Sequence, residues 1–565
     1  MTRYRIMLTV LLCVVPATLS APTIAGETLY NGIVLPDQWP PSAKHREPRK
    51  PMAVPYLKHP PAVIPIDVGR QLFVDDFLIA KSTVKRTFHT ARLHKANPVI
   101  KPDRAWEYNS GGWFAAPFSG GAWYDSKDKL FKIWYTGGYL HASCLATSKD
   151  GVTWNKPFFD VEKKTNIVVA PLDPKARRSV DTTSVWIDHD ETDPKKRYKY
   201  FATEAGHMRG WAMVYRTSAD GVHWTGPVAK QRIGGDRSTV FYNPFRKVWV
   251  LSERVGWGGR ARAYCENTDP EKLINEGALT NRGKRTMWVS GDDLDPTHTV
   301  KELACKPSLY NLDAAPYESL MIGAFSIWQG PHNGDCGRKQ LQKRNDILLG
   351  FSRDGFHWDR PNRKRFISCS WDEKSWRFGN VQSVASGCLI VGDKLHIYFS
   401  GRAKPRVGLY DTETSKTQGW DKDGATGLAI LRRDGFASMD AGDTTGTLTT
   451  RPVTFKGKHL FVNADCPKGE IRVELLDEAG KVIAPFSAAN CKPLSCDKTL
   501  AAITWTKGDL STLAGKTVRF RFSLKNARLY SFWVSPDKSG ASYGYVSAGG
   551  PGFTGATDTV GSAAY

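Results

Sequence analysis

The chain has 565 residues, which predicts two to four domains, or one large repeat domain with accessory parts. With 41% hydrophobic residues, 24% charged residues, 51 Gly and 33 Pro, the composition is that of a folded globular protein. Disordered, collagen-like and polytopic membrane proteins are therefore excluded. The formal net charge of +23, from 79 Lys and Arg against 56 Asp and Glu, favours anionic partners.

Residues 1–25 contain the basic, apolar and small-residue regions of a secretory signal peptide in their usual order. Arg3 and Arg5 precede an apolar run over residues 6–15, and small residues follow it. The run is too short to span a hydrocarbon layer of ~30 Å as a permanent helix. We therefore expect no membrane insertion and a secreted protein, periplasmic or extracellular. The alternative is a buried N-terminal strand.

The cysteines and the basic residues limit the kinds of ligand and macromolecule that this protein is expected to bind. Nine cysteines remain after removal of Cys13 with the signal, and neither a CxxC pair nor a Cys/His cluster at zinc spacing occurs. No metal and no cofactor is therefore predicted. The basic residues form short dispersed groups without a nucleic-acid-binding motif, which argues against nucleic acid. A sulfated or uronic polysaccharide fits the charge better, and a solvated basic surface without a role in binding is the alternative.

Residues 26–65 are rich in Pro, Lys and Arg and are interpreted as a lead-in segment that becomes ordered on contact with a folded domain, or as a linker.

A repeated turn is the strongest pattern in the sequence. The frame Ser-x-Asp-Gly-apolar-x-Trp-x-x-Pro occurs at 147–157, 217–227 and 351–361, and a shorter copy lies at 431–436. A degenerate copy at 286–296 completes five units of about 70 residues, each with an aromatic hairpin before its turn. Four strands per unit of ~40 to 70 residues are typical of a propeller blade.

The fold predicted over residues 66–440 is therefore an all-β, five-bladed β-propeller. In the repeated turn, Asp caps the turn, Gly supplies positive φ, and Trp fills the gap between blades. We therefore assign these residues to structure.

The repeat stops near residue 441. Alternating apolar and polar residues with Gly, Asn and Asp turns then predict a C-terminal β-sandwich over 441–540. The tail over 541–565 is rich in Gly, Ser and Ala and is predicted to be flexible.

The innermost strand of each blade lines the channel of a propeller, so residues that open these strands converge on its axis. The predicted inner strands open at Trp113, Asp181, Asp236, Tyr317-Glu318 and Asn380. Three of the five open with an acid, in consecutive units. A carboxylate on an apolar strand is costly to bury unless it is paired or functional. The alternative is that each acid only caps a turn.

The five units, the turns and the segments FVDDFLI (73–79) and NPVIKPDRAWE (97–107) resemble the five-bladed propeller glycoside hydrolases of families 32, 43, 62, 68 and 130. The resemblance covers 66–440. Families 43 and 62 place an acid on the first inner strand, where this chain has residues 113–115, WFA, so the exact family is unassigned. Sialidases have similar turns but six blades, and they remain an alternative.

The resemblance implies a glycoside hydrolase that cleaves a polysaccharide or oligosaccharide with two carboxyl groups. Asp181, Asp236 and Glu318 are the candidate catalytic residues. Glu318 follows Tyr317 in an apolar strand, so desolvation is expected to raise its pKa and make it the general acid. Asp181 or Asp236 is then the base or nucleophile.

Further polar and aromatic groups are expected to bind the substrate. Arg237 and Arg254 flank the third inner hairpin and are suited to a carboxylate or sulfate, or else to salt bridges with Asp236 or Glu253. The remaining candidates are His207, Tyr317, Asn380 and the possible sugar platforms Trp113, Trp211, Trp257 and Trp328. The other functions in view are a non-catalytic carbohydrate-binding propeller and a phosphorylase that receives phosphate on Arg237 and Arg254. The oligomeric state is not predicted.

Overall fold

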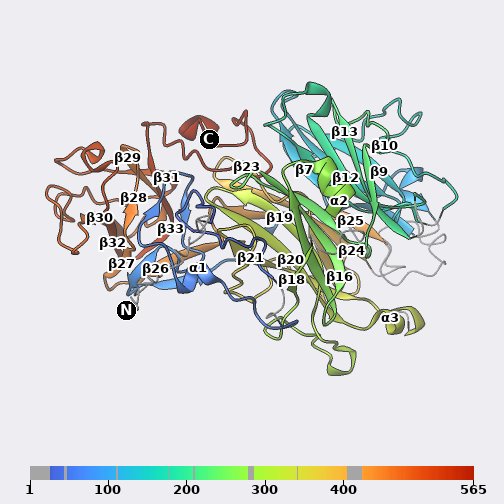
Figure 1. Cartoon of the computed structure of the whole chain (residues 1–565), viewed down its shortest axis with the longest axis horizontal. Coiled ribbons are helices and arrows are strands. Elements are labelled where there is room, and N and C mark those ends of the chain that lie inside the picture. The colour runs from blue at the N-terminus through green and yellow to red at the C-terminus, as the bar shows by residue number, and fades with distance from the viewer. Residues whose placement is uncertain are drawn as a thin grey trace, which may run out of the picture.

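The computed structural model describes most of the chain as β-structure in two bodies (Figure 1). The described residues are 26–42, 47–109, 112–176, 178–207, 210–277, 285–339, 341–403 and 423–565. The predicted signal peptide lies outside them. The α-helices in this part of the chain are α1 (Pro55–Lys58), α2 (Pro270–Gly277) and α3 (Asn333–Lys339). None of these described helices is long and apolar enough to span a membrane.

The larger body is a propeller of five antiparallel blades. Blade one contains β7 (Gly112–Asp125), β8 (Leu130–Gly137), β9 (Ala142–Ser148) and β10 (Ile167–Val169), with the short β6 (Tyr108–Asn109) paired to β7. Blade two contains β11 (Val180–Ile187), β12 (Tyr198–Ala205), β13 (Trp211–Ser218) and β14 (Ala229–Arg232). Blade three contains β15 (Thr239–Asn243), β16 (Val248–Gly256), β17 (Arg260–Asn267) and β18 (Thr286–Ser290).

The last two blades complete the ring. Blade four contains β19 (Ser308–Tyr317), β20 (Leu320–Gly330) and β21 (Arg344–Ser352). Blade five contains β22 (Asn380–Val384), β23 (Leu389–Val391), β24 (Lys394–Arg402), β25 (Gly424–Arg432) and, from before the first blade, β5 (Arg92–Leu93).

The inner strands β7, β11, β15, β19 and β22 contact one another in sequence around the axis. β7 pairs in parallel with β11 of blade two, where Ser119 lies opposite Thr183, and with β25 of blade five. The ring is therefore closed, and the predicted five-bladed propeller is confirmed.

The repeated turns have the structural role expected of them. The Ser148 hydroxyl accepts a hydrogen bond from the Gly151 amide at 2.9 Å, and Asp150 accepts from the next two amides at 2.8 and 2.7 Å. Gly151 has a φ of 71°, in the left-handed region that glycine adopts without strain. The Trp154 ring packs edge-on against Tyr398 of blade five. The motif thus ties neighbouring blades together.

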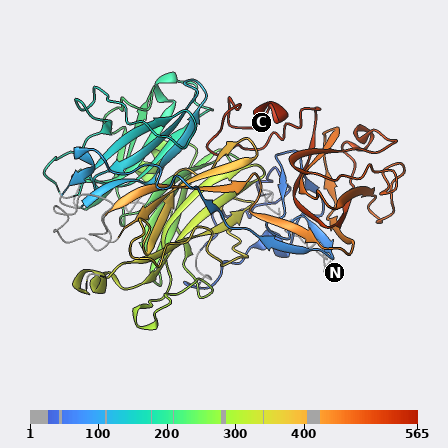
Figure 2. The ribbon, with the colours of Figure 1, turned by 180° about the vertical axis from the view of Figure 1, so that it is seen from behind.

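The smaller body is a β-sandwich that lies to the left in Figure 1 and to the right in Figure 2. One sheet has the order β31 (Asp497–Ile503), β29 (His459–Asp465), β33 (Ala527–Ser535), β26 (Ala437–Ala441) and β4 (Lys85–Phe88), with β2 (Gln71–Leu72) also on β33. The other has the order β3 (Ile79–Ser82), β27 (Gly446–Thr450), β32 (Arg519–Lys525) and β30 (Glu470–Leu476), and β1 (Ile64–Pro65) pairs with β28 (Val453–Thr454). Single 3-10 turns complete the structure at η1 (Ala105–Glu107), η2 (Pro194–Lys196), η3 (Lys301–Leu303), η5 (Leu510–Leu513) and η6 (Gly561–Ala564).

The domain boundaries differ from the predicted ones at residues 66 and 441. Strands β1 to β4, over 64–88, belong to the sandwich, and the blades span 92–432. The described part of the lead-in is not a bare linker, because Leu29, Leu35 and Tyr56 are buried in the sandwich core.

The tail over 541–565 was predicted to be flexible, but it is packed against the rest of the protein. Val546, Ala548 and Asp558 are buried, and Tyr545 pairs with Glu318 of the propeller. Its small residues allow close backbone approach, as where Gly550 lies against the backbone of Ile390. The tail therefore fastens the sandwich to blades four and five.

Candidate functional site

All five inner strands run in the same direction, so their first residues meet at one end of the channel. We call this end the mouth and define it by Trp113, Asp181, Asp236, Tyr310 and Asn380. The structure brings four of the predicted openings together here. The fourth strand, β19, opens at Ser308 and not at Tyr317, so Tyr310 takes the place that was assigned to Tyr317 and Glu318.

The carboxylate of Asp181 is buried and held by an arginine of the next blade. Its Oδ1 lies 3.3 Å from Nε of Arg237 and accepts a hydrogen bond from the Thr182 hydroxyl at 2.8 Å. The Arg237 guanidinium lies flat over Phe118, 3.4 Å from the ring centroid. Asp181 and Arg237 therefore form a fixed, buried pair beside the channel axis.

Asp236 is more open, with 30% of its side chain exposed. Its Oδ1 lies 3.1 Å from Nη1 of Arg260 and 3.7 Å from Nε of Arg254. Burial raises the pKa of Asp236, but Arg260, Arg254 and Arg237 outweigh burial and lower it overall. Asp236 is consequently an anion that bridges two arginines, as the salt-bridge interpretation of Arg254 anticipated.

Aromatic rings at the mouth contact two cationic side chains, Arg260 and Lys343. Tyr310 and Trp328 meet edge-on with centroids 6.1 Å apart. The Arg260 guanidinium lies 4.9 Å from the Tyr310 centroid, and the Lys343 ammonium lies 5.3 Å from it. Arg260 and Lys343 were missed in the sequence because Arg260 opens the outer strand β17, Lys343 directly precedes the outer strand β21, and no motif marks them.

A third carboxyl group lies deeper in the channel, on β19. Asp313 is 8% exposed and accepts hydrogen bonds from Nδ2 of Asn311 at 2.7 Å and from the Val384 amide at 2.9 Å. Burial raises its pKa to about 6, although hydrogen bonds from Ser119 and its other partners oppose this. Sequence reasoning missed Asp313 because it began the fourth inner strand at Tyr317 and not at Ser308.

Glu318 does not belong to this site. It follows β19 in the turn to β20, eight residues beyond Tyr310, which corresponds to about 26 Å of strand. Its carboxylate lies 3.4 Å from Nε of Arg70 and 3.3 Å from Nη2 of Arg433, and the Ser542 hydroxyl donates to it at 2.7 Å. Burial does raise the pKa of Glu318, but in an ion network between propeller and tail. The structure therefore does not bring Glu318 together with Asp181 and Asp236, as was expected of a general acid.

Tyr317 is also remote from the mouth. Its side chain is fully buried, and its hydroxyl donates to Oδ1 of Asp434 at 2.6 Å. It therefore supports the same network as Glu318 and does not lie at the mouth, where it was expected.

Asn380 is fully buried at the mouth. Its Oδ1 accepts from Nδ2 of Asn345 and from the Gln382 amide, each at 3.2 Å. The side-chain amide of Gln382 is oriented with its nitrogen toward Asn380. Its oxygen then accepts hydrogen bonds from Nη2 of Arg237 at 2.8 Å and from Nη2 of Arg402 at 3.2 Å. Asn380 thus positions Gln382, which in turn helps to fix two arginines.

Trp113 and His207 lie at the rim. Trp113 is half-buried, and its ring lies 5.1 Å from that of Tyr108. His207 is in the loop after β12, with Nε2 2.6 Å from Oε2 of Glu204, and 8% of its side chain is exposed. Glu204 also pairs with Arg216. His207 is therefore engaged by protein groups and presents little surface to a ligand.

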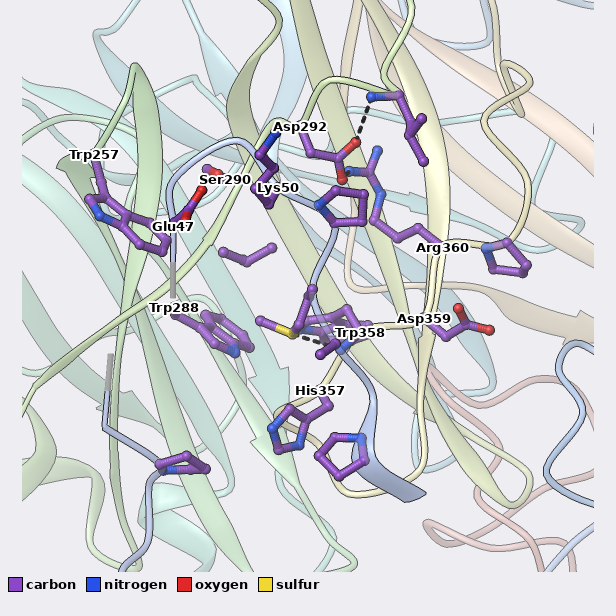
Figure 3. A pocket seen from close by; sticks show the side chains of 18 of the residues that line it. Glu47, Lys50, Trp257, Trp288, Ser290, Asp292, His357, Trp358, Asp359 and Arg360 are labelled. Carbon is purple, nitrogen blue, oxygen red and sulfur yellow. Dashed lines mark hydrogen bonds and ion pairs between the residues drawn. The ribbon is translucent and has the colours of Figure 1, made fainter. Parts of the chain in front are cut away.

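A separate cleft of about 700 Å³ lies between residues 41, 42 and 47–55 on one side and blades three and four on the other (Figure 3). It contains Trp257, which was expected at the mouth, together with Trp288 and Trp358. Burial raises the pKa of Asp359 in this cleft to about 6. Across the described residues, no group of three or more His, Cys, Asp or Glu side chains is placed to hold a metal ion, here or at the mouth.

No protein-family model matches the sequence, and no curated protein matches it. Among solved structures, an N-acetylgalactosamine deacetylase from F. plautii is 13% identical over 63% of this chain and 96% of its own, with a TM-score of 0.39. A fructofuranosidase from Schwanniomyces occidentalis is 12% identical over 79% and 98%, with a TM-score of 0.36. A family 43 arabinoxylan arabinofuranohydrolase from Bacillus subtilis is 11% identical over 79% and 99%, with a TM-score of 0.35. The chain is thus distantly similar to propeller glycoside hydrolases, and its exact family is unassigned.

Proposed function

We propose that the protein is an exported glycoside hydrolase that cleaves an anionic polysaccharide or oligosaccharide at the mouth of the propeller. The observation that carries this proposal is that Asp181 at the mouth and Asp313 deeper in the channel come from the inner strands of blades two and four. Glycoside hydrolysis needs one protonated and one ionised carboxyl group near the scissile bond. Asp313 supplies a carboxyl group whose pKa is raised by burial, and Asp181 supplies the second carboxyl group.

In this proposal Asp313 is the general acid and Asp181 is the base or nucleophile. Asp313 retains a proton up to a pH of about 6, because burial disfavours its ionised form. Ser119, which contacts Asp313, lies opposite Thr183, and Asp181 is two residues closer to the mouth. That offset corresponds to about 7 Å along the strand, which is the component along the channel axis of the separation between the two carboxyl groups.

Charge supports an anionic substrate. The formal net charge of +23 attracts polyanions over long range. At the mouth itself, Arg237, Arg254 and Arg260 add a local positive field beside the proposed catalytic pair. The signal-peptide pattern of residues 1–25 supports export.

The decisive experiment is product analysis on a panel of sulfated, uronic and neutral glycans with the wild type, Asp181→Asn and Asp313→Asn. We expect reducing-end release from an anionic glycan by the wild type, and a loss of at least 100-fold in each variant, because each lacks one member of the acid/base pair. Asp443→Asn, the same change at an exposed aspartate of the sandwich, is the matched control. Undiminished activity in both folded variants would refute the assignment.

The arginines favour a second candidate, a glycoside phosphorylase. Inorganic phosphate replaces one carboxylate in such enzymes, and Arg254 and Arg260, which lie beside Asp236, are suited to receive it. Cleavage that requires added phosphate and yields a sugar phosphate would establish this function in place of hydrolysis. A purely binding propeller predicts saturable glycan binding with no product under either condition.

A further inference from the structure

Positive groups outnumber negative ones at the mouth. The described carboxylates at or near the mouth are Asp181, Asp236, Asp313 and Asp423, and the basic groups around them include Arg237, Arg254, Arg260, Arg262 and Lys343. Arg262 is fully buried and donates to the backbone oxygens of Arg237 and Tyr310. The cluster therefore carries excess positive charge in a partly desolvated place.

Among the described residues, the nearby acids only partly offset this charge. Burial and repulsion from Arg260 and Arg254 together lower the pKa of Arg262 to about 9, although Asp313 and Asp236 oppose this. Burial and Arg260 also lower the pKa of Arg254. An arginine whose charged form is disfavoured in this way would be stabilised by a bound anion.

Two donors point to where such an anion would bind. Nε of Arg237 faces Asp181 and its Nη2 donates to Gln382, but its buried Nη1 has no hydrogen-bond partner among the described residues. Nε of Arg254, 3.7 Å from Asp236, also lacks a hydrogen bond within the described chain. Buried donors without acceptors are rare in folded proteins, and these two lie within the arginine cluster, so we take them as the candidate contacts of a bound anion.

The cations are held rigidly before any ligand arrives. Phe118 supports the flat face of Arg237, and the rings of Tyr310 and Trp328 support Arg260. Asp236 links Arg254 and Arg260 from the outer side. Guanidinium groups fixed in this way bind oxyanions with little loss of side-chain entropy.

We propose that Arg237, Arg254 and Arg260 form an oxyanion subsite for a sulfate ester or carboxylate carried by the sugar, and that Asp236 is a positioning residue for Arg254 and Arg260. The inference deepens the proposed function, on which its choice of a sugar substrate rests. It also removes Asp236 from the predicted catalytic set. The shared chemistry is a multi-oxygen anion, and sulfate ester, uronate and inorganic phosphate are its three sources.

The test separates binding from turnover. Isothermal titration of the full-length protein uses galactose 6-sulfate, glucuronic acid, inorganic phosphate and uncharged galactose as probes. We expect the sulfate ester or the uronate to bind at least tenfold more tightly than galactose, and Arg260→Gln and Arg254→Gln each to weaken that binding at least tenfold. Arg528→Gln removes a positive charge from an exposed site in the sandwich and is expected to change nothing. Equal binding of charged and neutral sugars, or preference for phosphate alone, would overturn the subsite.

Kinetics test the role of Asp236. If Asp236 positions the arginines, Asp236→Asn raises KM at least tenfold and leaves turnover within about threefold of the wild type, and sulfate binding weakens in parallel. A 100-fold loss of turnover with unchanged KM would show that Asp236 is catalytic and overturn its positioning role.

The two proposals fail separately. Anion binding through the arginines without cleavage of any glycan would refute hydrolysis and leave the subsite intact. Cleavage of neutral glycans that is insensitive to Arg254→Gln and Arg260→Gln would refute the subsite and leave hydrolysis intact.

Discussion

Asp313→Asn gives a direct measure of the environment in the channel. The substitution keeps the shape of the side chain and its acceptor for the Val384 amide, but removes the proton that titrates. Because burial raises the pKa of Asp313 from 3.8 to about 6, the folded state holds this proton more tightly than the unfolded state does. Its contribution to stability is therefore complete below a pH of ~4 and is lost as the pH rises through 6.

The size of the effect follows from that difference of about two pH units. At ~1.4 kcal/mol for each unit, the wild type loses up to about 3 kcal/mol of unfolding free energy from Asp313 between pH 4 and pH 7. The asparagine variant has nothing to titrate at this position. Relative to the wild type, it should therefore gain about 2 to 3 kcal/mol over the same interval.

Urea unfolding monitored by tryptophan fluorescence at a series of pH values measures this gain. Asp443→Asn, the exposed counterpart, should show a difference from wild type that does not vary with pH. A constant difference between Asp313→Asn and wild type from pH 4 to pH 7 would refute the argument that burial perturbs this carboxyl group.

Four further outcomes are expected. The rate of glycan hydrolysis falls as the pH rises through about 6, because Asp313 must be protonated to act as the acid; a pH–rate profile that is flat from 5 to 8 would contradict this. Glu318→Gln retains wild-type turnover and KM in the hydrolysis assay, because Glu318 lies about 26 Å of strand from the mouth. Arg433→Met lowers the unfolding free energy by about 3 to 5 kcal/mol in urea titrations, since it leaves Glu318 and Asp558 with less compensation, and a change under ~1 kcal/mol would contradict the network. Deletion of residues 541–565 lowers the melting temperature of the propeller and sandwich together in calorimetry, and an unchanged transition would show that the tail is not a fastener.

The blades could be predicted because their signal is local. An Asp-Gly turn needs only neighbouring residues, as in the bonds from Gly151 to Ser148, and its spacing counts the units. The fourth inner strand was misplaced because its end is not marked in this way. Glu318 forms the turn there with a φ of 50°, where Gly, Asn or Asp is usual, so the sequence carries no turn signal.

The remaining differences come from contacts between distant parts of the chain. Strand β4 pairs with β26, about 350 residues later in the chain. Because β4 has only four residues, its sequence pattern is too short to predict that pairing. At the mouth, Arg260 and Lys343 meet around Tyr310 from three different strands or loops. Convergence of this kind depends on how the blades are placed around the axis, which no spacing in one segment encodes.

Closure of the fifth blade by β5 has a consequence for biosynthesis. Leu93 emerges from the ribosome roughly 330 residues before Ala429, its partner in β25. Strands β1 to β4 are separated from their partner strands in the sandwich by even more residues. Neither body can be completed until almost the whole chain is available, so nascent chains carry unpaired strand edges for most of their synthesis. Such edges are prone to pair with other chains, which makes yield sensitive to chaperone supply and to the speed of elongation.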